Sequence, residues 1–139
     1  MELGSAAEFV RLRSSDDPHE YGAADKGTAA PEVWREVLAH YPDFRHWVAR
    51  NKTVPLEILQ ILAEDTDSRV RAAVATKQYL TPVLFDRLAQ DPDETVRLRV
   101  AHNASAPKTV LERLARDRSY LVSGRARVRL GGVAARERD

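Results

Sequence analysis

Apolar residues recur at helical spacing in four successive stretches of the chain, and each stretch follows a proline. The prolines recur at nearly equal intervals, and proline is preorganised for the first position of a helix. Apolar residues three or four positions apart share one helix face, so each stretch is predicted to be a helix with one buried face. The prolines are Pro31, Pro55, Pro82 and Pro107, and the predicted buried faces comprise Val33, Val37, Leu38, Ile58, Leu59, Ile61, Leu62, Leu84, Phe85, Leu88, Val110, Leu111 and Leu114.

A second, shorter helix is predicted after each first helix. A Leu-Ala pair ends each first helix, where alanine allows close packing, and a polar turn follows, as at residues 65–67 and 91–93. An aspartate or serine in such a turn accepts a hydrogen bond from the free amides at the start of a helix. The second helices at 70–75 and 96–101 share the pattern V-R-x-x-V-A, and phenylalanine replaces the first valine at 44–49.

Three residues follow the second helices at equal intervals, namely Asn51, Lys77 and Asn103. Asparagine readily adopts the left-handed conformation in which many helices end. We therefore predict that the two asparagines cap their helices. The regular recurrence of this position also supports a repeat length of about 26 residues.

The N-terminal part of the chain departs from this regular pattern. Ser5 and Glu8 have the spacing of a capping box, which predicts a short helix within residues 4–15. Residues 16–30 contain prolines, glycines and alanines, and we interpret them as a loop with one helical turn near residues 19–24.

The last copy of the pattern, at residues 120–130, is degenerate. It keeps apolar positions but contains alternating arginines before Gly131, and we favour an atypical terminal helix over a strand or an extended tail. Leu121, Val122, Val128, Leu130 and Val133 are expected to cover the end of the stack. The predicted organisation is an N-terminal helix and loop capping the stack (1–30), helical repeats (31–123) and a basic terminal cap or tail (124–139).

The composition limits the classes of protein that fit. A chain of 139 residues suits one domain. The absence of cysteine excludes disulfides, thiolate metal sites, iron–sulfur ligation and a cysteine nucleophile. No apolar run approaches the roughly 18 residues of a membrane-spanning helix, and the N-terminus lacks the pattern of a secretory signal, so a cytoplasmic location is expected.

Charge is unevenly distributed although the formal net charge is only +1. Residues 1–30 are predominantly acidic, whereas arginines predominate from residue 113 onward. This asymmetry is typical of a solvated basic tail, and it also allows steering of a partner or head-to-tail self-association.

The repeated features resemble the leucine-rich repeat variant family, whose short repeats are related to HEAT and armadillo repeats. They are a helix-opening proline, Leu-Ala, Asp-x-Asp and V-R-x-x-V-A, and they recur with the period given above from about residue 31 to about residue 123. The resemblance implies an all-α fold, a short right-handed α-solenoid of about four stacked helical hairpins, used for macromolecular binding. The founding type of the family adds a cysteine-ligated iron–sulfur segment, which this chain cannot have. An electron-transfer role is therefore not expected.

A row of arginines with the same period has two interpretations. Arg45, Arg71 and Arg97 could form a stripe that binds phosphates or an acidic peptide. Alternatively, Asp65 and Asp91 each precede an arginine by six positions, a spacing similar to the Asp/Arg ladder that bridges neighbouring HEAT-type repeats. The ladder is the favoured interpretation.

Residues that depart from the repeat pattern are the better candidates for binding, because stacking does not require them. They lie on or just after the second helices, which commonly line one extended face of a solenoid, and tryptophan and arginine are enriched at binding hot spots. Trp47 has a second interpretation, since it occupies the position of Ala73 and can fill the core of a looser repeat. The predicted partner-binding residues are His46, Trp47, Arg69, Arg71, Lys77, Arg97, Arg99 and His102.

Catalytic and metal-binding patterns are absent from the sequence. The four histidines, His19, His40, His46 and His102, lack the spacing of metal ligands on one helix. No nucleophile elbow, phosphate-binding loop or dinucleotide fingerprint occurs. Clustered carboxylates such as Glu64 lie in turns, where helix capping explains them. No catalytic, cofactor or metal site is expected.

The sequence therefore predicts a non-catalytic adaptor, scaffold or inhibitor that binds another protein through the face formed by its second helices. The alternative is nucleic-acid binding by the arginines of the second helices and the C-terminal tail, which the near-zero net charge makes less favoured. A third hypothesis, an enzyme with a pocket inside a helical-repeat shell, has only a generic concave surface in its favour. The expected state is a monomer with no membrane partner, and head-to-tail association is its alternative.

Overall fold

The computed structural model describes the backbone of residues 1–138 and the side chains of residues 1–132. Within this part the chain consists of α-helices and one 3-10 helix without β-strands, apart from an isolated bridge between Glu2 and Thr28. The predicted all-α class is confirmed. The helices are α1 (Ala6–Arg13), α2 (Pro18–Lys26), α3 (Pro31–His40), η1 (Pro42–Phe44), α4 (Arg45–Arg50), α5 (Leu56–Leu62), α6 (Ser68–Ala75), α7 (Pro82–Ala89), α8 (Glu94–His102), α9 (Lys108–Leu114) and α10 (Tyr120–Arg138).

The chain forms two compact units. Unit 1 is Met1–Glu64 and contains helices α1 to α5, and unit 2 begins at Asp65 and contains α6 to α10. The described helices include none with an apolar stretch long enough to span a membrane. Val133, one of the apolar residues expected at the end of the stack, and the tail arginines Arg136 and Arg138 lie outside the residues whose side chains are described.

Unit 1 has an aromatic core beneath its first three helices. α1 packs against α2 and α3, and the rings of Phe9 and Trp34 meet edge to face with centroids 5.3 Å apart. Both side chains are fully buried, together with Leu3 and Val37. The hydrophobic pattern predicted Val33 in this face, but Val33 is only half-buried and the neighbouring Trp34 is the larger core residue.

The start of unit 1 contains the predicted capping box and a longer second helix than predicted. Ser5 Oγ accepts a hydrogen bond from the Glu8 amide at 3.1 Å, and Glu8 Oε2 accepts one from the Gly4 amide at 3.2 Å. The single helical turn predicted near residues 19–24 is the longer helix α2, so residues 16–30 contain less loop than predicted. Asp17 caps α2 and Pro18 occupies its first turn, so the Asp-Pro pair was a helix-start signal.

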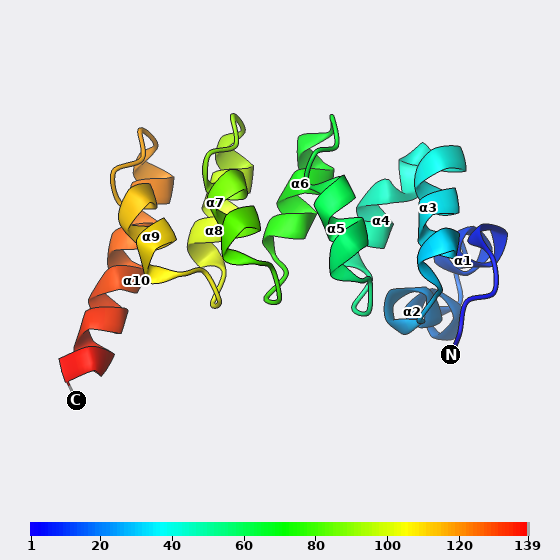
Figure 1. The fold of residues 1–139 in the computed structure, drawn as a ribbon. Coiled ribbons are helices and arrows are strands. Elements are labelled where there is room, and N and C mark those ends of the chain that lie inside the picture. The colour runs from blue at the N-terminus through cyan, green and yellow to red at the C-terminus, as the bar shows by residue number, and fades with distance from the viewer. Residues whose placement is uncertain (139) are drawn as a thin grey trace. The chain divides into compact units, whose positions relative to one another are not determined.

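Unit 2 consists of helices in two layers. α6, α8 and α10 are neighbours in one layer and α7 and α9 are neighbours in the other (Figure 1). Each first helix packs against the second helix that follows it, α7 against α8 and α9 against α10. The second helices of unit 2 therefore present one common layer, to which most of the predicted partner-binding residues belong.

The predicted helix starts are confirmed in both units. Pro31 and Pro82 lie in the first turn of α3 and α7, and Pro55 and Pro107 are the N-cap residues of α5 and α9. The turn aspartates cap the second helices of unit 2, since the side chains of Asp67 and Asp93 accept hydrogen bonds from the amides of Arg69 and Thr95.

Several apolar positions that were predicted to be covered are exposed. Leu121 and Val128, expected to cover the end of the stack, are 64% and 66% exposed. Ile61 is 47% exposed, because at about 100° per residue it is turned away from the face formed by Ile58, Leu59 and Leu62. Ala39 is also exposed, whereas its counterpart Ala89 is buried. In this copy α3 continues past the alanine, and the turn that follows starts with tyrosine and proline instead of aspartate.

The asparagines after the second helices are buried connectors, and the prediction of left-handed caps was wrong. Asn51 and Asn103 have φ of −56° and −69°, and no described residue has a positive φ. Asn51 Nδ2 donates to the carbonyls of Ala24 and Gly27 at 2.7 and 3.0 Å. Asn103 Nδ2 donates in the same way to the carbonyls of Ala75 and Lys77, at 2.8 and 2.7 Å.

Candidate functional site

Arg71 and Arg97 form the polar ladder of unit 2. Arg71 Nε donates to Asp91 Oδ2 at 2.7 Å, and its Nη1 donates to the carbonyl of Asp65 at 2.7 Å. Arg97 repeats this arrangement with Asp117, at 2.9 Å, and with the carbonyl of Asp91, at 2.8 Å. Each arginine thus joins the turn before its own helix to the corresponding turn of the next repeat.

Arg71 and Arg97, which were predicted to bind a partner, use their donors within the chain. The side chains of Arg97 and Asp117 are 5% and 9% exposed, and an arginine–carboxylate fork in such surroundings is already saturated with acceptors. The hydrogen bond to Asp91 raises the pKa of Arg71 above its ordinary value, against the opposing effect of burial. These contacts favour the ladder interpretation of the arginine row over the binding stripe.

Arg45, the first member of the row, lies in unit 1. Its Nε donates to the carbonyl of Leu38 at 2.9 Å, and the side chain is half-buried. The bond ties the start of α4 to the end of α3. Arg45 therefore also serves the scaffold of its unit.

His46 and Trp47 lie on α4 in an aromatic cluster of unit 1. Their rings meet edge to face with centroids 5.1 Å apart, and the guanidinium of Arg13 lies over the Trp47 ring at 3.5 Å from its centroid. Arg13 is also 5.1 Å from the centroid of Tyr21. Trp47 is half-buried, whereas its repeat counterpart Ala73 is buried. The tryptophan therefore packs under a cation on the flank of the core.

Arg69 is a highly exposed member of the predicted set. Its side chain is 83% exposed and forms a pair with Asp67, the N-cap residue of its own helix, at 2.9 Å. The hydrogen bond from the guanidinium to Asp67 raises the pKa of Arg69. A pair this exposed is strongly screened by water, so Arg69 remains available to a partner.

Arg99 and His102 on α8 line a shallow hollow of about 200 Å³ together with polar residues that follow α6. The full lining is Thr76, Gln78, Arg99, His102, Asn103 and Ala104. Arg125 is exposed on α10, which packs against α8, and its charge acts on His102. We call the hollow with Arg99, His102 and Arg125 the basic hollow.

The electrostatics of the basic hollow are positive. Partial burial is the largest cause that lowers the pKa of His102, and the charges of Arg125, Arg99 and Arg129 lower it further. In the described part of the chain, no carboxylate pairs with Arg99 or Arg125. The basic hollow therefore carries positive charge that no described carboxylate neutralises.

Arg129 satisfies the backbone beside the basic hollow instead of facing outward. Its Nη1 donates to the carbonyls of Ala101 and Asn103 at 3.1 and 2.9 Å, and its Nη2 donates to the carbonyl of Ala104 at 3.4 Å. The residue lies one period after Asn103 and forms the contacts that Asn103 forms one period earlier. Arg129 therefore satisfies three backbone acceptors at and just after the end of α8.

The eight predicted residues do not form a single site. Arg99 and His102 come together in the basic hollow, Arg71 and Arg97 belong to the ladder, and Arg69 stands at the start of α6. Lys77 is half-buried after α6, where its carbonyl accepts from Asn103. His46 and Trp47 belong to unit 1.

Sequence reasoning missed three residues that complete these clusters, namely Arg13, Tyr21 and Arg125. Arg125 lies one period after Arg99, so the repeat itself was a signal for it. Arg13 and Tyr21 lie outside the repeats, and no period connects them to Trp47. Their role follows only from the packing of α1 and α2.

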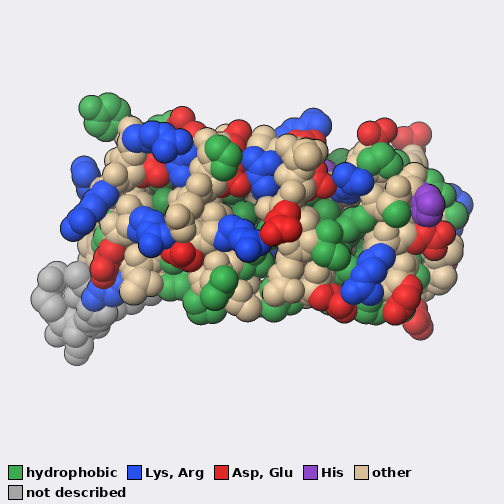
Figure 2. Space-filling model, turned by 45° about the horizontal axis from the view of Figure 1, so that its top comes forward, with side chains coloured by type: hydrophobic (Ala, Val, Ile, Leu, Met, Phe, Trp, Pro, Cys, Tyr) green, Lys and Arg blue, Asp and Glu red, His purple; other side chains and the backbone are tan. Residues whose placement is uncertain are grey.

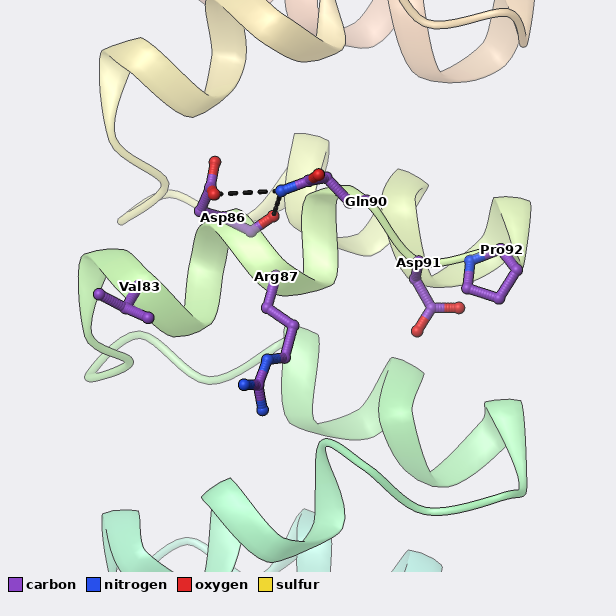
Figure 3. A pocket seen from close by; sticks show the side chains of 6 residues that line it. All are labelled: Val83, Asp86, Arg87, Gln90, Asp91 and Pro92. Carbon is purple, nitrogen blue, oxygen red and sulfur yellow. Dashed lines mark hydrogen bonds between the residues drawn. The ribbon is translucent and has the colours of Figure 1, made fainter.

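A second depression lies along α7 in unit 2 (Figure 3). It has a volume of about 500 Å³, and Gln90 Nε2 donates to the carbonyl and to the carboxylate of Asp86 at its rim, at 3.2 and 3.1 Å. Figure 3 shows Arg87 pointing away from this pair. The lining combines acidic, basic and amide groups along one helix, so it lacks the single-sign field of the basic hollow.

Elsewhere the surface charges are mixed. On the face drawn in Figure 2, basic and acidic side chains lie beside one another. Exposed pairs in the structure include Arg113–Asp86 in unit 2 and Arg35–Glu57 in unit 1. Among the described residues, no group of three His, Asp or Glu side chains is arranged to hold a metal ion. Comparisons with protein-family models, with curated proteins and with solved structures gave no match for this chain.

Proposed function

We propose that the chain is a non-catalytic α-solenoid binding module that recognises another protein through its second helices. The two-layered hairpins of unit 2, the Arg–Asp ladder and the regular repeat period support a solenoid of about four right-handed repeats, like those of the leucine-rich repeat variant family. We also propose that the protein is cytoplasmic.

One observation supports binding most directly. Arg99 and Arg125 are exposed on neighbouring second helices, yet neither forms an ion pair with a described carboxylate. Charges without an internal partner do not stabilise the fold through ion pairing, while exposed arginines are enriched where proteins bind other proteins. The predicted residues Arg99 and His102 are thus the centre of the proposed interface, and Arg125 is added to them.

Nucleic-acid binding is the second candidate, because the same cations make a positive potential, which adds to burial in lowering the pKa of His102. It ranks lower for a geometric reason. A phosphate backbone needs several spaced cations, but Arg71 and Arg97 are occupied by Asp91 and Asp117. The cations of the basic hollow form one local cluster and not a row that could follow a phosphate backbone.

The proposal is tested by affinity purification of the intact protein from an extract of the cells that produce it. We expect a protein partner that is retained by the wild type and lost by the double variant Arg99→Ala, Arg125→Ala. The matched control is Arg116→Ala, Arg118→Ala, which removes the same charge from exposed positions in the turn before α10. Absence of any partner, or equal loss in both double variants, contradicts the proposal.

A further inference from the structure

We infer that the basic hollow is a site for carboxylate side chains in an acidic segment of a protein partner. The inference rests on the proposed function and adds the chemistry of the partner. It assigns direct contacts to Arg99 and Arg125, and a proton-dependent contact to His102.

Arg99 and Arg125 have donors to offer. Arginine presents a fork of N–H donors that matches a carboxylate, and in the ladder this capacity is saturated by an aspartate and a backbone carbonyl. Neither Arg99 nor Arg125 has such acceptors among the described residues. The two side chains come from adjacent helices, so one acidic segment can reach both.

Capping of the C-terminal end of α8 does not explain the presence of Arg99 and Arg125. Cations near the last turn of a helix are often explained by its partial negative charge and its free carbonyls. Here Arg129 already donates to the carbonyls of Ala101, Asn103 and Ala104. Helix capping therefore accounts for Arg129 and leaves Arg99 and Arg125 without that role.

The dimensions of the hollow match a side chain better than a free metabolite. Small-molecule sites usually enclose about 300–1,000 Å³, whereas the hollow has about 200 Å³ and is open to solvent on one side. Thr76 and Gln78 line it together with Arg99 and His102. These features fit the end of an Asp or Glu side chain presented by a larger molecule.

His102 makes the contact sensitive to pH. The charges that face it are Arg99 from its own helix and Arg125 and Arg129 from α10, while the lining residues that follow α6, Thr76 and Gln78, are neutral. Burial and these cations lower the pKa of free His102. A carboxylate placed among the cations offsets their repulsion and raises that pKa, so binding takes up a proton near neutral pH and tightens as pH falls.

Calorimetric titration of the full chain with an acetylated oligoglutamate peptide tests the inference, with oligoglutamine as the neutral probe. We expect binding of oligoglutamate alone, weakened about tenfold or more by Arg99→Gln with Arg125→Gln, because each change removes a charge-assisted contact. The matched control, Arg116→Gln with Arg118→Gln, is expected to change the affinity less than about twofold. Unchanged circular dichroism shows that each variant remains folded.

The proton-linked contact has its own measurement. Titration in two buffers of different ionisation enthalpy reports proton uptake by the wild type, and His102→Gln is expected to abolish both the uptake and the gain in affinity between about pH 8 and about pH 5.5. Because glutamine retains hydrogen-bonding groups, this variant is expected to bind normally at the higher pH.

The outcomes separate the possible ligands. Failure of oligoglutamate to bind, or equal weakening in the control variant, overturns the inference. Tighter binding of single-stranded DNA than of oligoglutamate overturns it in favour of nucleic acid, and tighter binding of inorganic phosphate or a phosphopeptide overturns the assignment to carboxylates. If the purified partner still depends on Arg99 and Arg125 while oligoglutamate fails, the proposed function stands and only the acidic segment is wrong.

Discussion

The two units of the molecule are stabilised by different kinds of contact. Unit 1 is organised around rings, with Phe9 against Trp34 in the core and Arg13 over Trp47 at its flank. Unit 2 is organised around a repeated polar ladder, in which Arg71 and Arg97 make the same bonds one period apart. Unit 2 thus forms the same hydrogen bonds in successive repeats, whereas the ring contacts of unit 1 each occur once.

The largest expected effect concerns the ladder. Arg97→Ala leaves the largely buried Asp117 without its cation and frees the carbonyl of Asp91, and breaking a buried pair costs about 3–5 kcal/mol of the free energy of unfolding. Arg71→Ala should cost less, since the Arg71 side chain is 15% exposed against 5% for Arg97. Urea denaturation measures both values. Equal losses would show that burial does not set the strength of the ladder.

Substitution of Asn51 and Asn103 tests whether the two units are stabilised by the same kind of contact. Asn103→Ala removes the donor to two backbone carbonyls in unit 2. Asn51→Ala removes the donor to the carbonyls of Ala24 and Gly27 in unit 1, where Thr53 Oγ1 still donates to Gly27. Each substitution is expected to cost about 2 kcal/mol, within the usual cost of leaving buried acceptors unsatisfied. Denaturation of the two variants side by side checks this. If only one variant loses free energy of unfolding, the two asparagines have similar geometry but do not contribute equally to stability.

A smaller effect is expected in the aromatic cluster of unit 1. Arg13→Ala removes the cation from the Trp47 face, which should cost about 1 kcal/mol. The control is Arg11→Ala, whose side chain is 64% exposed in its pair with Glu20 and should change stability little. Thermal unfolding together with tryptophan fluorescence measures both variants. A control that is as destabilised as Arg13→Ala would remove any special role for the stacked cation.

The smallest expected effect is a pH dependence in unit 2. The pKa of His102 is lowered in the folded chain, so the unfolded chain binds the proton more readily and stability decreases as pH falls through the ordinary histidine range. His102→Gln should flatten this decrease, whereas His19→Gln, at an exposed position of unit 1, is the matched control. Denaturation at a series of pH values tests the sign, and a steeper decrease in the His102 variant would contradict it.

The sequence predicted the features that recur and missed those that occur once. The prolines, the capping aspartates and the ladder arginines were recognisable because each copy supports the next. Trp34 in the core and the contact between Arg13 and Trp47 were not, since they depend on how α1 packs in unit 1. Asn51 and Asn103 were located correctly but given the wrong role, because a local capping preference does not reveal carbonyls that lie a whole repeat away in the chain.

The candidate site was predicted only in part for the same reason. Arg99 and His102 were selected because they depart from the repeat, and the structure places both at the basic hollow. The sequence favoured a ladder role for Arg97 and a binding role for Arg99, yet both stayed among the predicted partner-binding residues. Only the positions of Asp117 and of the carbonyls show which arginine is already occupied.

The offset of the ladder has a consequence for engineering the length of unit 2. Each period supplies an arginine that requires an aspartate from the following period, and Asp117 completes the last such bond while Ser123 stands where the next arginine would be. A duplicate of one whole repeat inserted before residue 104 would therefore bring its own donor and its own acceptor. We therefore expect a longer version of unit 2 to fold with α10 kept as its last helix.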